Sequence, residues 1–491
     1  MERVLSVSQM QYADKFTIEK LGVCQDELVK RAGGAVADVV KEHFVGGRVL
    51  VCVGKGNNGK DGLVIADILS KTHGFSVSIF NTETCFFKVF EKDYDIVIDC
   101  IFGTGLNKYV DGKYLEIINK INSINAVKIA CDIPSGINGD TGEVMGVAVK
   151  ANITVAIQEY KLGHFLGDGI DYCGKVVCKD IGISVWDDDV VKRIGKTEVK
   201  QLFNHRDRNV NKGNFGKTCI IGGSQDFPGS VILSSNATSA LKSGVGYTYL
   251  VVPKTLYNAY VGKNPECILI AQDLDSDIVD ACSLEKVLHC NSIGVGMGMT
   301  ASQSTYNVIE YLLKNYSGTL IIDADGLNVL SKFGKACLKD KKCQVVLTPH
   351  LGEFCRLLGE DKGEVYKDII GKSKKFAKEY DVILAVKSAV SIITNGEETY
   401  INTTGCSGMA KAGSGDALSG LISGVLARTE TSVENVAGSL YVFGKAGEFA
   451  QKNGCEFTIT ATEIIEQFSN VINSFWLSKV HAKTTVKSKK D

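Results

Sequence analysis

The chain has 491 residues, of which 44% are hydrophobic and 23% are charged, and its formal net charge at pH 7 is -1. This is the composition of a globular protein, and the near-zero charge argues against nucleic acid or an anionic membrane as a partner. No stretch reaches the about 18 consecutive apolar residues of a membrane span, and the opening MERVLSVSQMQYADKF lacks the apolar core of a signal peptide. We therefore expect a cytoplasmic protein with two domains that acts on small molecules.

In the first half of the chain, short apolar runs alternate with longer amphipathic stretches, as in β-α-β units around a parallel sheet. Strands are predicted at 48–53, 76–80, 95–100, 127–132 and 152–157, and helices at about 62–72 and 112–124. A charged, irregular stretch at 183–210 follows, and it suits a linker with one short helix. The first domain is expected to span residues 1–200.

The same alternation restarts after residue 210. Strands are predicted within 217–223, 246–252, 291–296, 319–325, 343–349 and 382–388, and amphipathic helices at 229–242, 301–314, 363–379 and 415–427. The second domain is expected to span 201–475, and the lysine-rich end, 476–491, lacks periodicity and is expected to be a basic disordered tail. Both halves thus belong to the α/β class.

The sixteen cysteines and seven histidines do not follow a metal-binding pattern, since neither C-x-x-C nor H-E-x-x-H occurs. Cys52, Cys100, Cys131 and Cys219 fall in predicted strands, where a thiol packs as a small apolar group. We expect reduced structural thiols, and a metal or redox role is the less favoured alternative.

The loop GKGNNGKDG (54–62) lies between a predicted strand and a predicted helix. Gly54, Gly56 and Gly59 satisfy G-x-G-x-x-G, in which backbone N–H groups hold a phosphate at a helix N-terminus. That motif alone is weak evidence. The loop also contains polar residues, Asn57, Asn58 and Asp61, which predicts that side chains contribute to binding.

Two further strands end in an aspartate followed by a Gly-rich loop. These are DCIFGTGL, with Asp99 before Gly103 and Gly105, and CDIPSGINGDTG, with Asp132 before Ser135. Each aspartate alone could be a turn or capping residue. In a doubly wound sheet, however, the three loops converge on one crevice at the carboxyl ends of the strands.

The three motifs, in this order, resemble the epimerase domain of the NAD(P)H-hydrate repair family, which implies a Rossmann-like three-layer domain. The resemblance implies a potassium ion held by Asn58, Asp99 and Ser135. Asp132 is the expected acid/base group, because epimerising a hydroxyl-bearing ring carbon requires proton movement. The residues implied to contact the hydrated dinucleotide are Asn57, Asn58, Gly59, Lys60, Asp61, Gly103, Thr104, Gly105, Leu106, Asn107, Lys108, Tyr109 and Asp132. Lys60 stands where the family usually has glycine, so it could crowd the loop or reach a substrate phosphate.

A second site is predicted in KAGSGDALSGLISGVLA (411–427). Small residues at the start of a helix leave several backbone N–H groups free to hold a transferring phosphate. Asp416 follows directly and is placed to accept a proton from a hydroxyl that attacks the phosphoryl group. The alternative is an aspartate that only stabilises the first turn of the helix.

This G-x-G-D element is similar to that of the ribokinase-like α/β fold. Together with NFGKTCIIGGS, IGVGMG, IDADGLNVL, LTPHLGE and AVKSAVSII, it resembles the nucleotide-dependent NAD(P)H-hydrate dehydratase over about 210–475. The resemblance implies that Gly296, His350 and Asp416 contact the hydrated nucleotide, with Asn328 and Glu353 behind these contacts or in a magnesium network. The alternative for His350 and Glu353 is that they only cap a helix. The residues implied to hold ADP or ATP are Lys387, Ser388, Ala389, Val390, Ser391, Gly413, Ser414 and Gly415.

Together the two resemblances imply repair of hydrated NADH and NADPH. The first domain would interconvert the R and S hydrates, and the second would dehydrate the S hydrate, with release of phosphate and AMP or ADP. The expected cofactors are potassium and magnesium ions, with ADP or ATP as co-substrate, and a homo-oligomer such as a tetramer is expected. The alternatives are a vitamin or sugar kinase with a regulatory nucleotide-binding module, and a binding or scaffold protein without catalysis.

Overall fold

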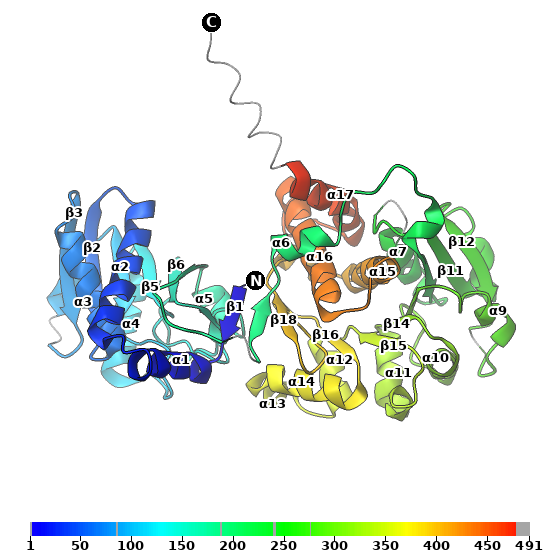
Figure 1. The fold of residues 1–491 in the computed structure, drawn as a ribbon, viewed down its shortest axis with the longest axis horizontal. Helices are drawn as coiled ribbons and strands as arrows, with labels where there is room; N and C mark the ends of the chain where they lie inside the picture. Colours follow the sequence, from blue (N-terminus) through cyan, green and yellow to red (C-terminus); the bar gives the residue numbers. More distant parts are fainter. Residues whose placement is uncertain (1, 85–86, 187–188, 239–241, 275, 478–491) are drawn as a thin grey trace, which may run out of the picture. The chain divides into compact units, whose positions relative to one another are not determined.

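The structure, a computed structural model, describes residues 2–84, 87–186, 189–238, 242–274 and 276–477 (Figure 1). The chain divides into two compact units, Glu2–Val191 and the part from Lys192 onward. The division falls before the expected boundary near residue 200, which lies within α6 (Lys196–Gln201) of the second unit. Of the expected tail, residues 478–491 lie outside the described residues, and Trp476 belongs to the last helix.

The first unit contains a six-stranded parallel sheet with the order β3-β2-β4-β5-β6-β8. The five strands predicted from this half are confirmed, and β8 was not predicted. The strands are β2 (Gly47–Val53), β3 (Phe75–Asn81), β4 (Ile96–Cys100), β5 (Val127–Cys131), β6 (Ile153–Ile157) and β8 (Lys175–Lys179). Every residue of β4 and β6 is buried, as expected of strands that are covered on both faces.

Helices cover both faces of this sheet, which gives three layers (Figure 1). The helices are α1 (Val7–Glu19), α2 (Gln25–His43), α3 (Asn57–Ser70), α4 (Gly112–Ser123) and the short α5 (Gly169–Tyr172). Val49 and Val51 of β2 pack with α2 and α3, whereas Leu50 and Cys52 pack with α4 on the opposite face. A further strand pair, β1 (Glu2–Leu5) and β7 (Tyr160–Lys161), is parallel.

One predicted boundary in this unit is wrong. Helix α3 begins at Asn57 and not near residue 62, so Asn57, Asn58 and Asp61 lie in the first turns of the helix and not in the preceding turn. Gly and Asn have low helix propensity, which hid the true start. The polar side chains are therefore presented by a regular helix.

The second unit contains a sheet with the order β12-β11-β10-β13-β14-β15-β16-β17-β18-β9. The pairs from β12 to β16 are parallel, the next two pairs are antiparallel, and β9 pairs with β18 in parallel. The six predicted strands are confirmed, whereas β9, β12, β17 and β18 were not predicted. The strands are β9 (Val191–Arg193), β10 (Lys217–Ile221), β11 (Tyr247–Pro253), β12 (Cys267–Gln272), β13 (Ser292–Val295), β14 (Thr319–Ile322), β15 (Gln344–Leu347), β16 (Ile383–Val386), β17 (Ser391–Thr394) and β18 (Thr399–Asn402).

Helix α15 forms the centre of the largest core of this unit, since every residue from Ala417 to Leu426 is buried. The predicted helix at 363–379 is interrupted at Asp368, whose side chain accepts a hydrogen bond from the Gly371 N–H and so starts a new helix. The helices are α7 (Pro228–Thr238), α8 (Tyr257–Tyr260), α9 (Ala281–Glu285), α10 (Gln303–Asn315), α11 (Asp325–Phe333), α12 (Leu351–Leu358), α13 (Lys362–Lys367), α14 (Ile369–Tyr380), α15 (Ser414–Leu426), α16 (Val433–Asn453) and α17 (Ala461–Leu477).

Candidate active sites

A cleft of about 780 Å³ opens at the carboxyl ends of the strands in the first unit. Its walls come from α1, α2, the start of α3 and the loops that follow β4 and β5. Of the residues predicted to contact the dinucleotide, those lining the cleft are Asn57, Asn58, Asp61, Gly103, Thr104, Gly105, Leu106, Asn107, Lys108, Tyr109 and Asp132. The structure thus brings three separate sequence motifs to one cavity.

Gly59 and Lys60 do not line this cleft. Gly59 is buried against the preceding strand end, where a Cβ atom would lie 1.8 Å from the carbonyl oxygen of Gly54. Only glycine allows this close approach of the two backbone segments. Lys60 is exposed, so its side chain does not occupy the cavity.

Beside the cleft, Asp99 and Ser135 form a buried polar cluster. The Ser135 hydroxyl and N–H donate to the two Asp99 carboxylate oxygens at 2.6 and 2.7 Å. The Asn58 side-chain amide donates to the carbonyl oxygen of Phe102 at 2.8 Å. The other polar atom of this amide, Oδ1, is buried and has no hydrogen-bond partner in the part of the chain that the structure describes. The three predicted cation ligands therefore surround one place, and one oxygen there is unsatisfied.

Asp132 follows β5 and adopts a left-handed backbone conformation, with φ of 66°. Such a conformation is uncommon for a residue with a side chain, and it is kept by surrounding contacts. Lys161 forms an ion pair with the Asp132 carboxylate, which also accepts the Ile157 N–H at 3.1 Å. The Nε2 atom of His164 contacts the Asp132 carbonyl oxygen at 2.8 Å. The predicted acid/base residue is thus fixed at both its backbone and its side chain.

Three residues at this site were not predicted from the sequence. Asp14 and Lys161 line the cleft, and His164 lies behind Asp132. Burial lowers the pKa of His164 to about 4, so the ring is neutral. None of the three belongs to a Gly-rich strand-end loop, and YKLGH (160–164) carries no pattern that indicates a site. Their positions depend on the pairing of β7 with β1.

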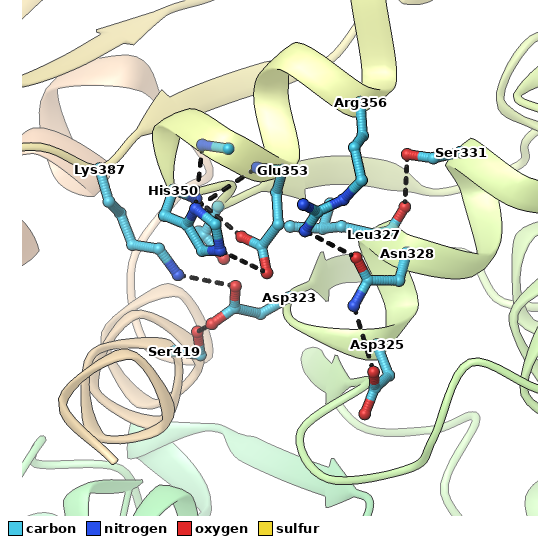
Figure 2. A network of polar contacts seen from close by, with 12 residues as sticks. Asp323, Asp325, Leu327, Asn328, Ser331, His350, Glu353, Arg356, Lys387 and Ser419 are labelled. Atoms are coloured by element: carbon cyan, nitrogen blue, oxygen red, sulfur yellow. Dashed lines mark hydrogen bonds and ion pairs between the residues drawn. The ribbon is translucent and has the colours of Figure 1, made fainter. Parts of the chain in front are cut away.

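In the second unit, the carboxyl ends of β13, β14, β15 and β16 converge. Gly296 has a φ of 113°, and a Cβ atom there would lie 2.1 Å from the carbonyl oxygen of Asp323, so this position requires glycine. Asp323 is buried and accepts hydrogen bonds from Lys387 at 2.8 Å and from the Ser419 hydroxyl (Figure 2). This ion pair lies beside Gly415, because a Cβ atom there would be 3.4 Å from Lys387 Nζ.

Helix α15 begins at this point. Gly413 precedes the helix in a left-handed conformation, with φ of 87°, and Asp416 lies in the first turn. Burial raises the pKa of Asp416 to about 6, and the negative charge of Asp323 contributes to the rise. The hydroxyl of Ser414 is buried and unpaired within the described residues. The structure thus places Asp416 beside the free N–H groups of the helix, next to a lysine.

His350 and Glu353 form a reciprocal cap at the start of α12. The His350 N–H donates to Glu353 Oε2 at 2.7 Å, and His350 Nδ1 accepts the Gly352 N–H at 3.0 Å (Figure 2). Burial raises the pKa of Glu353 to about 7 and, with the nearby cation Lys387, lowers the pKa of His350. The predicted alternative, helix capping, is therefore what both side chains do in this structure.

The structure also gives the surroundings of Asn328 and of the predicted nucleotide-binding segment, residues 387–391. Asn328 connects Asp325 and Arg356, since its amide nitrogen donates at 3.2 Å and its oxygen accepts at 3.1 Å (Figure 2). Ser388 and Ala389 are exposed after β16, whereas Val390 and Ser391 are buried where β17 begins. Of the predicted nucleotide segment, only the part from Lys387 to Ala389 is accessible.

Within the described residues, no three or more His, Cys, Asp or Glu side chains are grouped so that they could hold a metal ion. No helix of the described part combines the length and apolarity needed to cross a membrane. The fifteen cysteines that the structure describes are free thiols.

Comparison with known proteins assigns both units. Residues 218–470 match the family described as NAD(P)H-hydrate dehydratase, and residues 25–89 and 80–163 match the YjeF-related protein N-terminus. The bifunctional NAD(P)H-hydrate repair enzyme Nnr of Thermofilum pendens is 29% identical, with 96% of each chain covered. The enzyme of the same name from Hyperthermus butylicus is 30% identical over 93% of this chain and 90% of its own length.

A solved structure supports the fold of the second unit. The ADP/ATP-dependent NAD(P)H-hydrate dehydratase of Bacillus subtilis, crystallised with ATP/Mg²⁺, superposes with a TM-score of 0.50 and 24% identity, covering 58% of this chain and 99% of its own. A ribokinase-like superfamily protein from Enterococcus faecalis gives a TM-score of 0.51. With the near full-length sequence matches, these findings show that the chain belongs to the family of bifunctional NAD(P)H-hydrate repair enzymes.

Proposed function

We propose that this chain repairs hydrated NADH and NADPH through two separate sites. The first unit interconverts the R and S hydrates, and the second dehydrates the S hydrate at the expense of ADP or ATP. The observation that carries the proposal is that each unit matched by the family has one aspartate beside a lysine within the family motifs. Asp132 follows β5 beside Lys161, and Asp416 lies in the first turn of α15 beside Lys387. No electrons are transferred in either reaction.

In the first unit, the cleft holds the hydrated nicotinamide nucleotide, and Asp132 moves a proton at the hydroxyl-bearing ring carbon. A potassium ion fits beside it, because the unsatisfied Asn58 Oδ1 lies in the same cluster as Asp99, Ser135 and the Phe102 carbonyl oxygen. These are oxygen donors of the kind that a hard monovalent cation takes. The ion, when bound, would supply positive charge that fixes the loops around the substrate.

In the second unit, Asp416 accepts the proton of the substrate hydroxyl as this attacks the terminal phosphate of the nucleotide. The backbone N–H groups at Gly413, Ser414 and Gly415 hold the transferring phosphate, and Lys387 offsets its charge. The phosphorylated hydroxyl then leaves as phosphate, and loss of a proton from the adjacent ring carbon to solvent restores the double bond of the reduced nicotinamide. Magnesium enters with the nucleotide phosphates and would offset their charge, since it is commonly held by phosphates and few carboxylates.

The test is recovery of the reduced-nicotinamide absorbance from a mixture of R and S NADH hydrates, with magnesium, potassium and either ADP or ATP. Asp416→Asn should abolish nucleotide-dependent recovery, and Asp132→Ala should leave the R hydrate unrepaired while the S hydrate is still consumed. A stable phosphorylated product would instead favour a kinase. Loss of both activities from either substitution would contradict the two-site assignment.

The location of the enzyme in the cell and its assembly with other copies are predictions. Action in the cytoplasm, where the reduced nucleotides are held, and assembly as a homo-oligomer both rest on the resemblance. Sedimentation of the purified chain measures that assembly.

A further inference from the structure

The cleft of the first unit contains three carboxyl groups in different surroundings. Asp14 comes from α1, Asp61 from α3, and Asp132 from the loop after β5. Within the described residues, Asp132 is the one of the three that forms an ion pair. Its partner, Lys161, has a side chain that is only 1% exposed and also donates to the Ile157 carbonyl oxygen at 2.6 Å.

The contacts of Asp132 hold its side chain in one orientation, as an ion pair with the ammonium group of Lys161. The backbone N–H of Lys161 donates to His164 Nδ1 at 3.0 Å. The other nitrogen of this ring, Nε2, therefore carries the proton and donates it to the Asp132 carbonyl oxygen. Lys161 and His164 therefore orient each other as well as Asp132, and together they maintain its left-handed backbone.

Asp61 is in the opposite situation. Burial, followed by the negative charges of Asp132 and Asp14, raises the pKa of Asp61 to about 8, and Lys60 acts weakly in the other direction. The pKa of Asp14 is raised to about 6 for the same leading reason. At neutral pH, Asp61 thus carries a proton that faces the same cleft as the Asp132 carboxylate.

We infer that Asp61 and Asp132 form an acid–base pair in the epimerase reaction, with Lys161 and His164 as positioning residues for Asp132. This inference rests on the proposed function. Two carboxyl groups whose surroundings separate their protonation states are a general arrangement for acid–base catalysis. Asp61 then has a chemical role beyond contact with the substrate.

The pair would act by opening and closing the hydrated ring, with every proton transfer between the substrate and these two carboxyl groups. Asp132 accepts the proton of the ring hydroxyl, the freed electron pair forms a carbonyl group, and the bond between that carbon and the ring nitrogen breaks. Asp61 gives its proton to the nitrogen. After rotation of the carbonyl, the nitrogen attacks its other face and returns its proton to Asp61, while Asp132 returns its proton to the oxygen. No oxidant, reductant or water molecule is consumed.

The inference predicts an alkaline limit of the epimerase. Activity should fall above about pH 8 as Asp61 loses its proton. The titratable and charged groups that face Asp61 are Asp14 from α1, Asp132 after β5, Lys60 on its own helix, Cys100 of β4 and Cys131 of β5. Burial raises the pKa of Cys100, and a hydrogen bond to Cys100 together with burial raises the pKa of Cys131. Both thiols therefore stay neutral in this range, and the limit is assigned to Asp61.

The experiment follows conversion of purified R NADH hydrate to the S hydrate by chromatography, with potassium and without ADP or ATP. Asp61→Asn keeps the shape of the side chain, but the amide group cannot give up and regain a proton as a carboxyl group does. We expect kcat to fall about 10²- to 10³-fold with little change in KM, and the alkaline limit to disappear. The matched control is Asp67→Asn on the same helix, where the side chain is exposed and pairs with Lys71.

Folding is monitored separately from catalysis. Trp186 packs on Phe16 and Tyr12 of α1, and in a Trp476→Phe background it is the one tryptophan of the chain. Its emission therefore reports the first unit alone. Lys161→Met should lower kcat with little change in KM, because the Asp132 carboxylate loses the ion pair that orients it.

The outcomes separate the inference from the proposed function. A folded Asp61→Asn variant with wild-type kcat, or with an unchanged alkaline limit, would overturn the acid–base pair while leaving the epimerase assignment intact. A wild-type kcat in a folded Lys161→Met variant would remove the positioning role. Failure of the wild-type chain to convert the hydrate above the spontaneous rate would contradict the proposed function itself.

Discussion

The buried ion pair of Lys387 and Asp323 allows the effect of removing one partner to be worked out. Asp323 has 1% side-chain exposure and Lys387 has 18%, and their charged atoms are 2.8 Å apart. Lys387→Met keeps most of the side-chain volume but leaves the Asp323 carboxylate with the Ser419 hydroxyl as its remaining side-chain donor in the described structure. Breaking a buried pair costs about 3–5 kcal/mol, and the partial exposure of Lys387 favours the lower value.

The assay is urea unfolding of the second unit. In a Trp186→Phe background, Trp476 is the one tryptophan, and it lies on α17 against His205 with ring centroids 4.2 Å apart. We expect a free energy of unfolding about 3 kcal/mol lower for Lys387→Met than for its parent. The control is Asp323→Asn with Lys387→Met, which removes both charges and should recover about half or more of the loss. A loss below about 1 kcal/mol, or no recovery in the control, would refute the reasoning.

Three further predictions follow from contacts in the two sites. Gly59→Ala should abolish the epimerase and spare the dehydratase, because the new methyl group would overlap the Gly54 carbonyl oxygen; the two activities measured on one preparation check this. Asn58→Leu should remove the stabilisation that potassium, compared with sodium, gives the first unit in urea unfolding. The pKa of Glu353 rises from 4.5 to about 7 on folding, so the folded state binds this proton more tightly. The free energy of unfolding of the second unit should therefore fall by at most about 3 kcal/mol as the pH rises through this range. Glu353→Gln should flatten this dependence of stability on pH. A potassium response that survives in Asn58→Leu, or an unchanged slope in Glu353→Gln, would count against the respective contact.

Much of the fold could be predicted because the central strands are continuous apolar runs. Strands β4 and β6 are buried along their whole length, and the sequence alone located them within one residue. The start of α3 could not be found in this way. Its first residues are Asn and Gly, which local propensity assigns to a turn, and the close approach to Gly54 explains the glycine at position 59.

The candidate sites, too, could be predicted only in part from the sequence. Motif spacing predicted that Asp99, Asp132 and the loop from Gly103 converge, because parallel strands end at one edge of the sheet. It could not indicate Lys161, which reaches Asp132 across 29 positions of sequence through tertiary packing. Nor could it predict that Lys387 pairs with Asp323, since one residue follows β16 and the other follows β14.

The cap at the start of α12 determines which chemistry His350 can perform. Two backbone N–H groups, of Gly352 and Glu353, point at Nδ1, so that nitrogen must present its lone pair. With the ring kept neutral by its lowered pKa, the single proton resides on Nε2. This tautomer makes His350 a hydrogen-bond donor through Nε2, which faces Glu353 Oε1 at 3.5 Å, and prevents it from acting as a base through Nδ1. In the proposed reaction, proton abstraction in the second unit is therefore assigned to Asp416.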